Sequence, residues 1–170
     1  MRTILFDIDS VLADIMVPWL EQYNRDYDDD LTKDKILSWD IHQFVKPECG
    51  RNIYKYLTPG MYDVTPVIPG AVSSVELARR YGRVIFATSA HFVPGRKLTW
   101  LNDNGFFVRD KDYVECLDKG LIRADILIDD YELNLVEFPK GILFDQPWNR
   151  HSKLRRTVGF DNFRELLEEK

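Results

Sequence analysis

Cysteine is scarce in this chain of 170 residues, and its two cysteines, Cys49 and Cys116, lie far apart. Neither belongs to a Cys-x-x-Cys pair or has a histidine at metal-binding spacing, so the sequence predicts neither a disulfide framework nor a zinc site. Such cysteine usage is typical of proteins from a reducing compartment. We therefore expect the protein in the cytoplasm.

Excess positive charge and long apolar runs are also lacking. The formal net charge is −5, which argues against a broad basic face for duplex nucleic acid. One small anionic ligand, held by a few lysines and a metal, remains compatible with this charge. No apolar run reaches membrane-spanning length, and Asp7 and Asp9 interrupt the region where a signal peptide would need an apolar core. We expect a soluble, unprocessed protein with no membrane partner.

The first apolar segment of the chain, residues 3–6, runs directly into two carboxylates, Asp7 and Asp9. A buried parallel strand would deliver these acids to its carboxyl edge, where open α/β sheets bind ligands. An unpaired carboxylate costs several kcal/mol to bury, so we expect an ion or a cationic partner nearby. An ordinary strand that ends in a solvated acidic turn is the alternative.

Two later apolar segments end in polar side chains in the same way. Residues 126–128 precede a second acidic pair, Asp129 and Asp130, and residues 84–87 precede two hydroxyl side chains, Thr88 and Ser89. Because parallel strands present their carboxyl ends at one edge of a sheet, these side chains are expected to meet. The sequence therefore predicts one polar site built from three strand ends.

Segments with the apolar spacing of a helix lie between these predicted strands. The patterns predict helices over 15–27, 69–82, 95–104 and 161–168, and further strands over 113–116, in preference to 106–108, and over 141–144. Such alternation implies a doubly wound α/β fold with a parallel sheet and right-handed crossovers. Residues 15–67 interrupt the alternation with helical, aromatic-rich sequence. We therefore expect a core domain formed by residues 1–14 and 68–170, with residues 15–67 as a helical insertion.

The order and spacing of these motifs resemble those of the haloacid dehalogenase superfamily of phosphohydrolases. In that superfamily, an insertion after the first strand forms a cap over the active site. A closer resemblance, to the bacterial and phage type of the 5′(3′)-deoxyribonucleotidase family, covers nearly the whole chain. It is carried by residues 6–9, 11–14, 69–72, 88–89, 118–119 and 124–130.

The resemblance implies a covalent mechanism at the first motif. Asp7 would attack phosphorus to give an aspartyl phosphate, and Asp9 would protonate the departing alcohol and later deprotonate water. Oxygen ligands without a Cys/His cluster select Mg²⁺. Its expected ligands are Asp7 and either Asp129 or Asp130. The resemblance adds the main-chain oxygen of Asp9 and favours Asp130 as the direct ligand.

Hydroxyl and ammonium groups are expected to hold the phosphate. By resemblance, Thr88 and Ser89 would donate to phosphate oxygens, although such a pair more often caps a helix. Lys119, which lies ten residues before Asp129, would offset the negative charge of the aspartyl phosphate. Lys97 is the alternative for that role, and a surface position is the ordinary expectation for either lysine.

Trp39 lies where the family places aromatic residues against the nucleobase, so it is expected either to stack on a base or to lie in the core. Two positions depart from the family pattern. Ser10 replaces a frequent glycine, which leads us to expect an ordinary backbone conformation there. Phe92 stands where mammalian members have a phosphate-binding lysine, a role that Arg96 or Lys97 could take.

These features together predict an Mg²⁺-dependent phosphatase that hydrolyses deoxyribonucleoside 5′(3′)-monophosphates through an aspartyl phosphate. One alternative is a phosphatase of the same type that acts on a sugar phosphate or on the 3′-phosphate end of a nucleic acid. Another alternative is a non-catalytic nucleotide-binding domain. The presence of both Asp7 and Asp9 argues against it, because a protein that only binds needs neither a nucleophile nor a proton donor. A homodimer is left open. Residues 145–149 look like the bacterial and phage members, but no role is assigned to them.

Overall fold

A six-stranded parallel sheet forms the centre of the computed structural model, which describes residues 2–89 and 95–169. The strand order across the sheet is β3-β2-β1-β4-β5-β6, and every strand pair within it is parallel. The strands are β1 (Arg2–Phe6), β2 (Gly82–Thr88), β3 (Tyr113–Glu115), β4 (Ile126–Asp129), β5 (Lys140–Phe144) and β6 (Arg156–Thr157). The predicted doubly wound α/β fold is confirmed.

Helices connect these strands and build the insertion after β1. The α-helices are α1 (Met16–Tyr27), α2 (Ala71–Arg79), α3 (Arg96–Asp103), α4 (Glu132–Leu135) and α5 (Phe163–Glu168). Short 3₁₀ helices are η1 (Lys33–Lys35), η2 (Ile41–Gln43), η3 (Gly50–Tyr56), η4 (Pro59–Asp63), η5 (Asp110–Asp112), η6 (Lys119–Leu121) and η7 (Pro147–Asn149). In the described part of the chain, no helix has the length and apolar character needed to cross a membrane.

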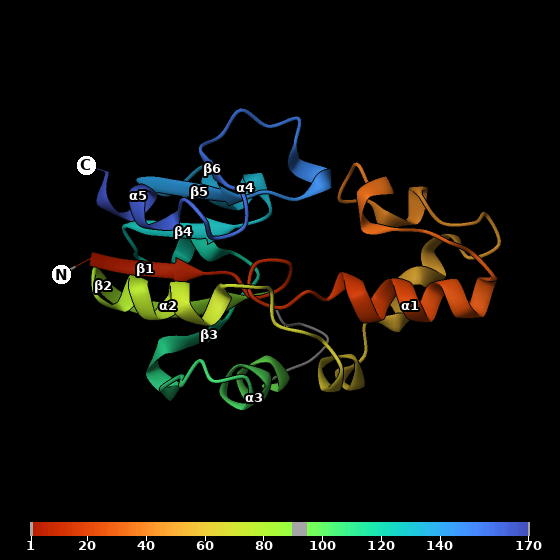
Figure 1. Ribbon diagram of the computed structural model, residues 1–170, viewed down its shortest axis with the longest axis horizontal. Coiled ribbons are helices and arrows are strands. Elements are labelled where there is room, and N and C mark those ends of the chain that lie inside the picture. The colour runs from red at the N-terminus through yellow and green to blue at the C-terminus, as the bar shows by residue number, and fades with distance from the viewer. Residues whose placement is uncertain (1, 90–94, 170) are drawn as a thin grey trace.

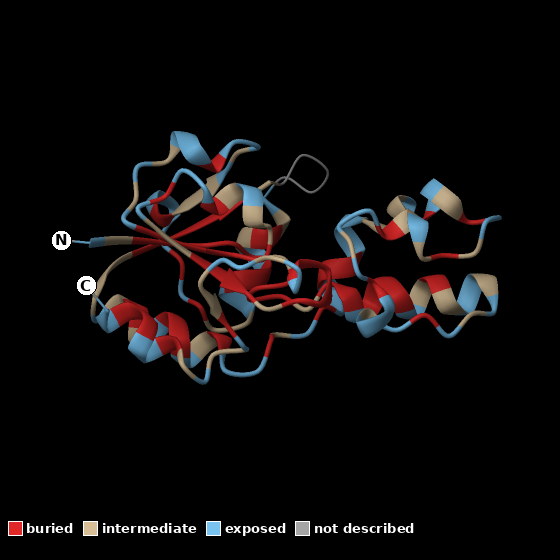
Figure 2. Ribbon diagram, turned by 90° about the horizontal axis from the view of Figure 1, so that it is seen from above, coloured by how far each residue is buried: buried red, intermediate tan, exposed pale blue. Residues whose placement is uncertain are grey.

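Side chains of β1 alternate between two apolar clusters, as the pleat of a strand requires. Phe6 belongs to a large cluster that also contains residues of α2, α3 and α5. Leu5 belongs to a smaller cluster on the opposite face, together with Leu135 of α4. The sheet is therefore buried on both faces, which explains why its strands read as continuous apolar runs (Figure 2).

The insertion lies beyond the carboxyl ends of the strands, to the right of the sheet in Figure 1. Its two connections to the sheet run side by side, because Ala13 forms an antiparallel bridge with Val67. The amide of Ile68 also donates to the carbonyl oxygen of Leu12, at 2.8 Å. This pairing holds the insertion over the sheet edge at which the acidic motifs end.

The strand preferred from the sequence, 113–116, is confirmed as β3, whereas residues 106–108 form no strand. The helix predicted over 69–82 is shorter, since α2 begins after Gly70, which adopts a left-handed conformation with φ 84°. The sequence did not predict β6, because two residues carry no periodic signal.

The expectation of an ordinary backbone at Ser10 is wrong. Ser10 has φ 59°, a left-handed conformation that costs an L-residue about 1–2 kcal/mol. The surrounding turn offsets this cost, since the Ser10 amide donates to the carbonyl oxygen of Ala13 at 2.8 Å. In addition, the side-chain amide of Gln146 donates to the Ser10 carbonyl oxygen at 2.6 Å. A hydrogen bond thus joins the turn after Asp9 to the segment that follows β5.

The pairing of β1 with β2 requires a glycine at position 82, opposite Arg2. A Cβ atom there would lie 2.3 Å from the carbonyl oxygen of Arg2, which is backbone and has little freedom to move. We expect Gly82→Ala to lower the free energy of unfolding by about 1–3 kcal/mol through overpacking. Urea denaturation measures this, with Gly60→Ala as the matched control, because a Cβ at Gly60 meets nothing closer than 3.9 Å. Equal stability of the two variants would contradict the prediction.

Candidate active site

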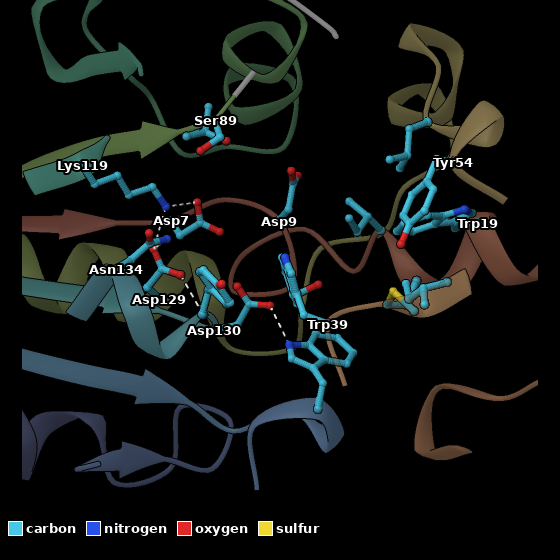
Figure 3. A pocket seen from close by; sticks show the side chains of 18 of the residues that line it. Asp7, Asp9, Trp19, Trp39, Tyr54, Ser89, Lys119, Asp129, Asp130 and Asn134 are labelled. Carbon is cyan, nitrogen blue, oxygen red and sulfur yellow. Dashed lines mark hydrogen bonds and ion pairs between the residues drawn. The ribbon is translucent and has the colours of Figure 1, made fainter. Parts of the chain in front are cut away.

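A pocket of about 540 Å³ lies between the carboxyl ends of the strands and the insertion. The strand ends provide its polar floor, and the insertion provides an aromatic wall (Figure 3). Among the lining residues are Asp7, Asp9, Thr88, Ser89, Lys119, Asp129 and Asp130 of the floor and Trp19, Trp39 and Tyr54 of the wall. The side chains predicted to meet at one sheet edge therefore share one pocket.

Three carboxylates and one ammonium group form the centre of this floor. Oxygen atoms of Asp7, Asp129 and Asp130 lie within 4.8 Å of one another, and all three residues are buried. Lys119 Nζ lies 2.5 Å from Asp7 Oδ1 and 2.6 Å from Asp129 Oδ2. Lys119, one of the two lysines expected to offset the charge of a phosphorylated Asp7, therefore contacts the Asp7 carboxylate.

The electrostatics of this cluster favour an additional cation. Burial raises the pKa of Asp7 to about 7; Lys119 opposes the rise, and Asp129 and Asp9 add to it. Burial, followed by Asp129 and Asp7, also raises the pKa of Asp130 well above its usual value. Lys119 is the one ammonium group that the described residues place on this cluster, so negative charge is in excess. An all-oxygen donor set of this kind fits a hard divalent cation.

Hydrogen bonds distinguish the two adjacent aspartates. Asp129 Oδ2 accepts from Lys119 and also from the side-chain amide of Asn134, at 3.0 Å. Its other oxygen, Oδ1, accepts from the amide of Tyr131 at 2.8 Å. Asp130 Oδ2 accepts from Trp148 Nε1 at 3.1 Å, and no hydrogen bond from the described residues reaches its Oδ1. Asp130 is thus the freer of the two for a further ligand.

Asp9 lies in a separate group of contacts on the side of α3. Its Oδ1 accepts from the hydroxyl of Tyr62 at 2.5 Å, and its Oδ2 lies 2.6 Å from Lys97 Nζ. Burial, followed by the charge of Asp9, raises the pKa of the Tyr62 phenol, which therefore remains a hydrogen-bond donor. In Figure 3, the Asp9 carboxylate points away from Asp7. Each of the two aspartates of the first motif therefore has its own lysine.

Thr88 and Ser89 both line the pocket, as expected. Thr88 Oγ1 accepts from Lys97 Nζ at 2.7 Å, and Ser89 Oγ donates to the carbonyl oxygen of Cys116 at 3.4 Å. Phe92, at the position of the phosphate-binding lysine of mammalian members, lies outside the described residues. Arg96 forms an ion pair with Asp63 of the insertion.

Trp39 lies in the wall of the pocket and is half exposed, so it is not a buried core residue. Its ring stacks on Tyr131, with centroids 5.3 Å apart and planes inclined by 23°. The ring of Trp148 lies against it in a tilted arrangement, 5.7 Å away. An aromatic surface thus connects the insertion to the residues that follow Asp130.

Sequence reasoning missed several polar partners of this site. Tyr62, Asn134 and Trp148 have no motif of their own, and each reaches an aspartate that is distant in the chain or on another element. For Trp148 a signal did exist, since residues 145–149 match the bacterial and phage type of the resembling family. Without the fold, however, nothing connected that segment with Asp130.

Comparison with known proteins agrees with this geometry. The family model described as 5′ nucleotidase, deoxy (pyrimidine), cytosolic type C protein matches residues 1–168. A 5′(3′)-deoxyribonucleotidase from Clostridium acetobutylicum is 36% identical over 152 residues, covering 87% of this chain and 84% of that protein. A protein of the same name from Bacillus subtilis is 34% identical over 170 residues, covering 97% of this chain and 96% of that protein.

Solved structures with low sequence identity share the fold. The haloacid dehalogenase-like hydrolase SP0104 from Streptococcus pneumoniae superposes with a TM-score of 0.59 at 9% identity, covering 96% of this chain and 97% of that one. The magnesium-bound structure of YfnB from Bacillus subtilis gives 0.62 at 15% identity, covering 99% of both chains. The chain therefore has a haloacid dehalogenase-like fold and belongs to the family of deoxy (pyrimidine), cytosolic type C 5′-nucleotidases.

Proposed function

We propose that this chain hydrolyses deoxyribonucleoside 5′- or 3′-monophosphates to a nucleoside and inorganic phosphate. The observation that carries the proposal is the contact of Asp7 with Lys119 on the floor of a pocket whose opposite wall is aromatic. The names of the relatives from Clostridium acetobutylicum and Bacillus subtilis support a deoxyribonucleotide as the substrate. Residues 15–67 would act as a cap over this pocket, with residues 1–14 and 68–170 as the catalytic core.

Asp7 is the proposed nucleophile. One of its oxygens forms a bond to phosphorus while the bond from phosphorus to the ester oxygen breaks, and the ester oxygen takes a proton from Asp9. Asp9 then accepts a proton from water, whose oxygen attacks phosphorus and releases Asp7 and phosphate. Lys119 forms an ion pair with Asp7 and would offset negative charge on the phosphorylated carboxylate.

The remaining polar residues would bind the phosphate and the metal. Thr88 and Ser89 are proposed to donate to phosphate oxygens from the end of β2. Asp7, Asp130 and the main-chain oxygen of Asp9 are the proposed Mg²⁺ ligands. Two observations support this set: carboxylates outnumber ammonium groups in the cluster, and Asp130 Oδ1 accepts no hydrogen bond from the residues that the structure describes. When bound, Mg²⁺ would neutralise charge on the transferring phosphate.

Trp39 is the proposed contact for the nucleobase. It is half exposed at the pocket wall, and stacking on an indole tolerates different bases. The same machinery could act on another small phosphomonoester, but such a substrate would leave the aromatic wall without a partner. A purely nucleotide-binding domain is less well supported, because it needs neither the Asp7 to Lys119 contact nor a second aspartate at position 9.

Two further properties remain proposals. The free cysteines Cys49 and Cys116 are consistent with a cytoplasmic location. Formation of a homodimer is the other property that we propose.

Activity measurements test the nucleophile and the substrate class. A panel of deoxyribonucleoside monophosphates and sugar phosphates, assayed for phosphate release, should show preferential hydrolysis of the nucleotides.

Asp7→Asn should lower turnover by about 10³-fold or more while the protein stays folded, because the amide keeps the volume but is a poor nucleophile. Asp110→Asn, an exposed change outside the pocket, is the control. Turnover of Asp7→Asn within tenfold of wild type would rule out the covalent mechanism.

A comparison of two substrates separates a base contact from a structural role of Trp39. Trp39→Ala should weaken nucleotide binding by about 1–3 kcal/mol and leave turnover of para-nitrophenyl phosphate nearly unchanged. Steady-state kinetics with both substrates, together with a melting curve, measure this. Leu37→Ala is the matched control, because Leu37 is also exposed and lies two residues away. An equal loss of activity on both substrates, together with a lower melting temperature, would show that Trp39 has a structural role and does not contact the base.

A further inference from the structure

Lys97 is fully buried on α3, yet it does not line the pocket and has no part in the chemistry proposed for Asp7. Burying an ammonium group is costly unless it is closely paired. Its Nζ lies 2.6 Å from Asp9 Oδ2 and 2.7 Å from Thr88 Oγ1. The lysine therefore joins the second aspartate of the first motif to the strand end that is expected to hold phosphate.

Tyr62 approaches the same aspartate from the insertion. Its hydroxyl donates to Asp9 Oδ1 at 2.5 Å, and its side chain is almost completely buried. The ring of Tyr62 lies 5.9 Å from Lys97 Nζ. Since Lys97 bonds one carboxylate oxygen of Asp9 and Tyr62 bonds the other, the orientation of this carboxylate is fixed by two donors.

The two donors belong to one packed unit. Trp100 of α3 donates from Nε1 to the carbonyl oxygen of Thr65 at 2.9 Å, just after η4. Arg96, at the start of α3, forms an ion pair with Asp63 at the end of η4. These contacts hold η4 against α3, so Tyr62 and Lys97 reach Asp9 from a common, well-anchored support.

We propose that Lys97 and Tyr62 are positioning residues, which hold the Asp9 carboxyl group in the place from which it transfers a proton to the leaving group. The inference rests on the proposed phosphatase function. In the first step, the electron pair of the broken bond between phosphorus and oxygen stays on the ester oxygen, which takes the proton of Asp9. Asp9 is left as a carboxylate, and the two donors stabilise that product.

Lys97 also affects Thr88. By donating to Thr88 Oγ1, the ammonium group occupies a lone pair of this hydroxyl and leaves its hydrogen to be donated elsewhere. A phosphate bound at the end of β2 would accept that hydrogen. Lys97 would thus support phosphate binding through Thr88, whereas the sequence suggested a direct contact with phosphate.

The test compares leaving groups through kcat/KM, which reports the steps up to transfer of the phosphoryl group to Asp7. A nucleotide releases an alkoxide that needs the proton, whereas para-nitrophenyl phosphate releases a stable phenolate that needs it little. We expect Lys97→Met to lower kcat/KM for a deoxyribonucleoside monophosphate by about 10²-fold, and Tyr62→Phe to lower it by about tenfold. For para-nitrophenyl phosphate, Tyr62→Phe should stay within about threefold of wild type. Lys97→Met should lose less on this substrate than on the nucleotide, because the two substrates share only the support of phosphate binding through Thr88.

Tyr56→Phe is the matched control for Tyr62→Phe. Tyr56 also donates to a carboxylate, Asp26, but on the surface of the insertion and away from the pocket, so its loss should change neither substrate. Lys111→Met serves the same purpose for Lys97→Met, because Lys111 is exposed.

Equal losses on both substrates, or no loss on either, would overturn the positioning role. If Lys97→Met fails to fold, the removal of a single oxygen in Tyr62→Phe decides the question. Failure of the underlying function is distinguishable, since wild-type protein would then release no phosphate from the nucleotide.

Discussion

The excess of negative charge at one edge of the sheet is the constraint on which the rest of the site depends. Parallel pairing of β1 with β4 brings Asp7 next to Asp129 and Asp130, where all three side chains are largely buried. Lys119 bridges two of these carboxylates from η6. Burial raises the pKa of both Asp7 and Asp130, so each carboxylate is stabilised either by a proton or by a further cation beside it. The gathering of three carboxylates at this edge supports the proposed metal site.

The insertion supplies what the sheet edge lacks. Its outgoing part carries Trp39 to the rings of Tyr131 and Trp148, and its returning part carries Tyr62 to Asp9. Trp148 also donates to Asp130, so the aromatic wall and the acidic floor share a residue. Trp148 thus links the proposed base contact, Trp39, with the proposed metal ligand, Asp130.

Sequence alone could predict the strand ends, because a parallel sheet gathers them whatever the connections are. Asp7, Thr88 and Asp129 were placed together for that reason. Contacts such as Tyr62 with Asp9 could not be predicted, since they depend on how the insertion folds back over the edge. The left-handed backbone of Ser10 was also unforeseen: its cost is offset by Gln146, which lies 136 residues away in the sequence. Local propensity carries no information about such distant partners.

We propose that a divalent cation neutralises the excess negative charge of Asp7, Asp129 and Asp130. Calorimetric titration of the protein with Mg²⁺, combined with melting curves, tests this without any substrate. We expect saturable binding, with a melting temperature that rises with Mg²⁺ concentration. Both effects should be largely lost in Asp130→Asn and kept in Asp110→Asn. Absence of binding to the wild type, or unchanged binding to Asp130→Asn, would contradict the account.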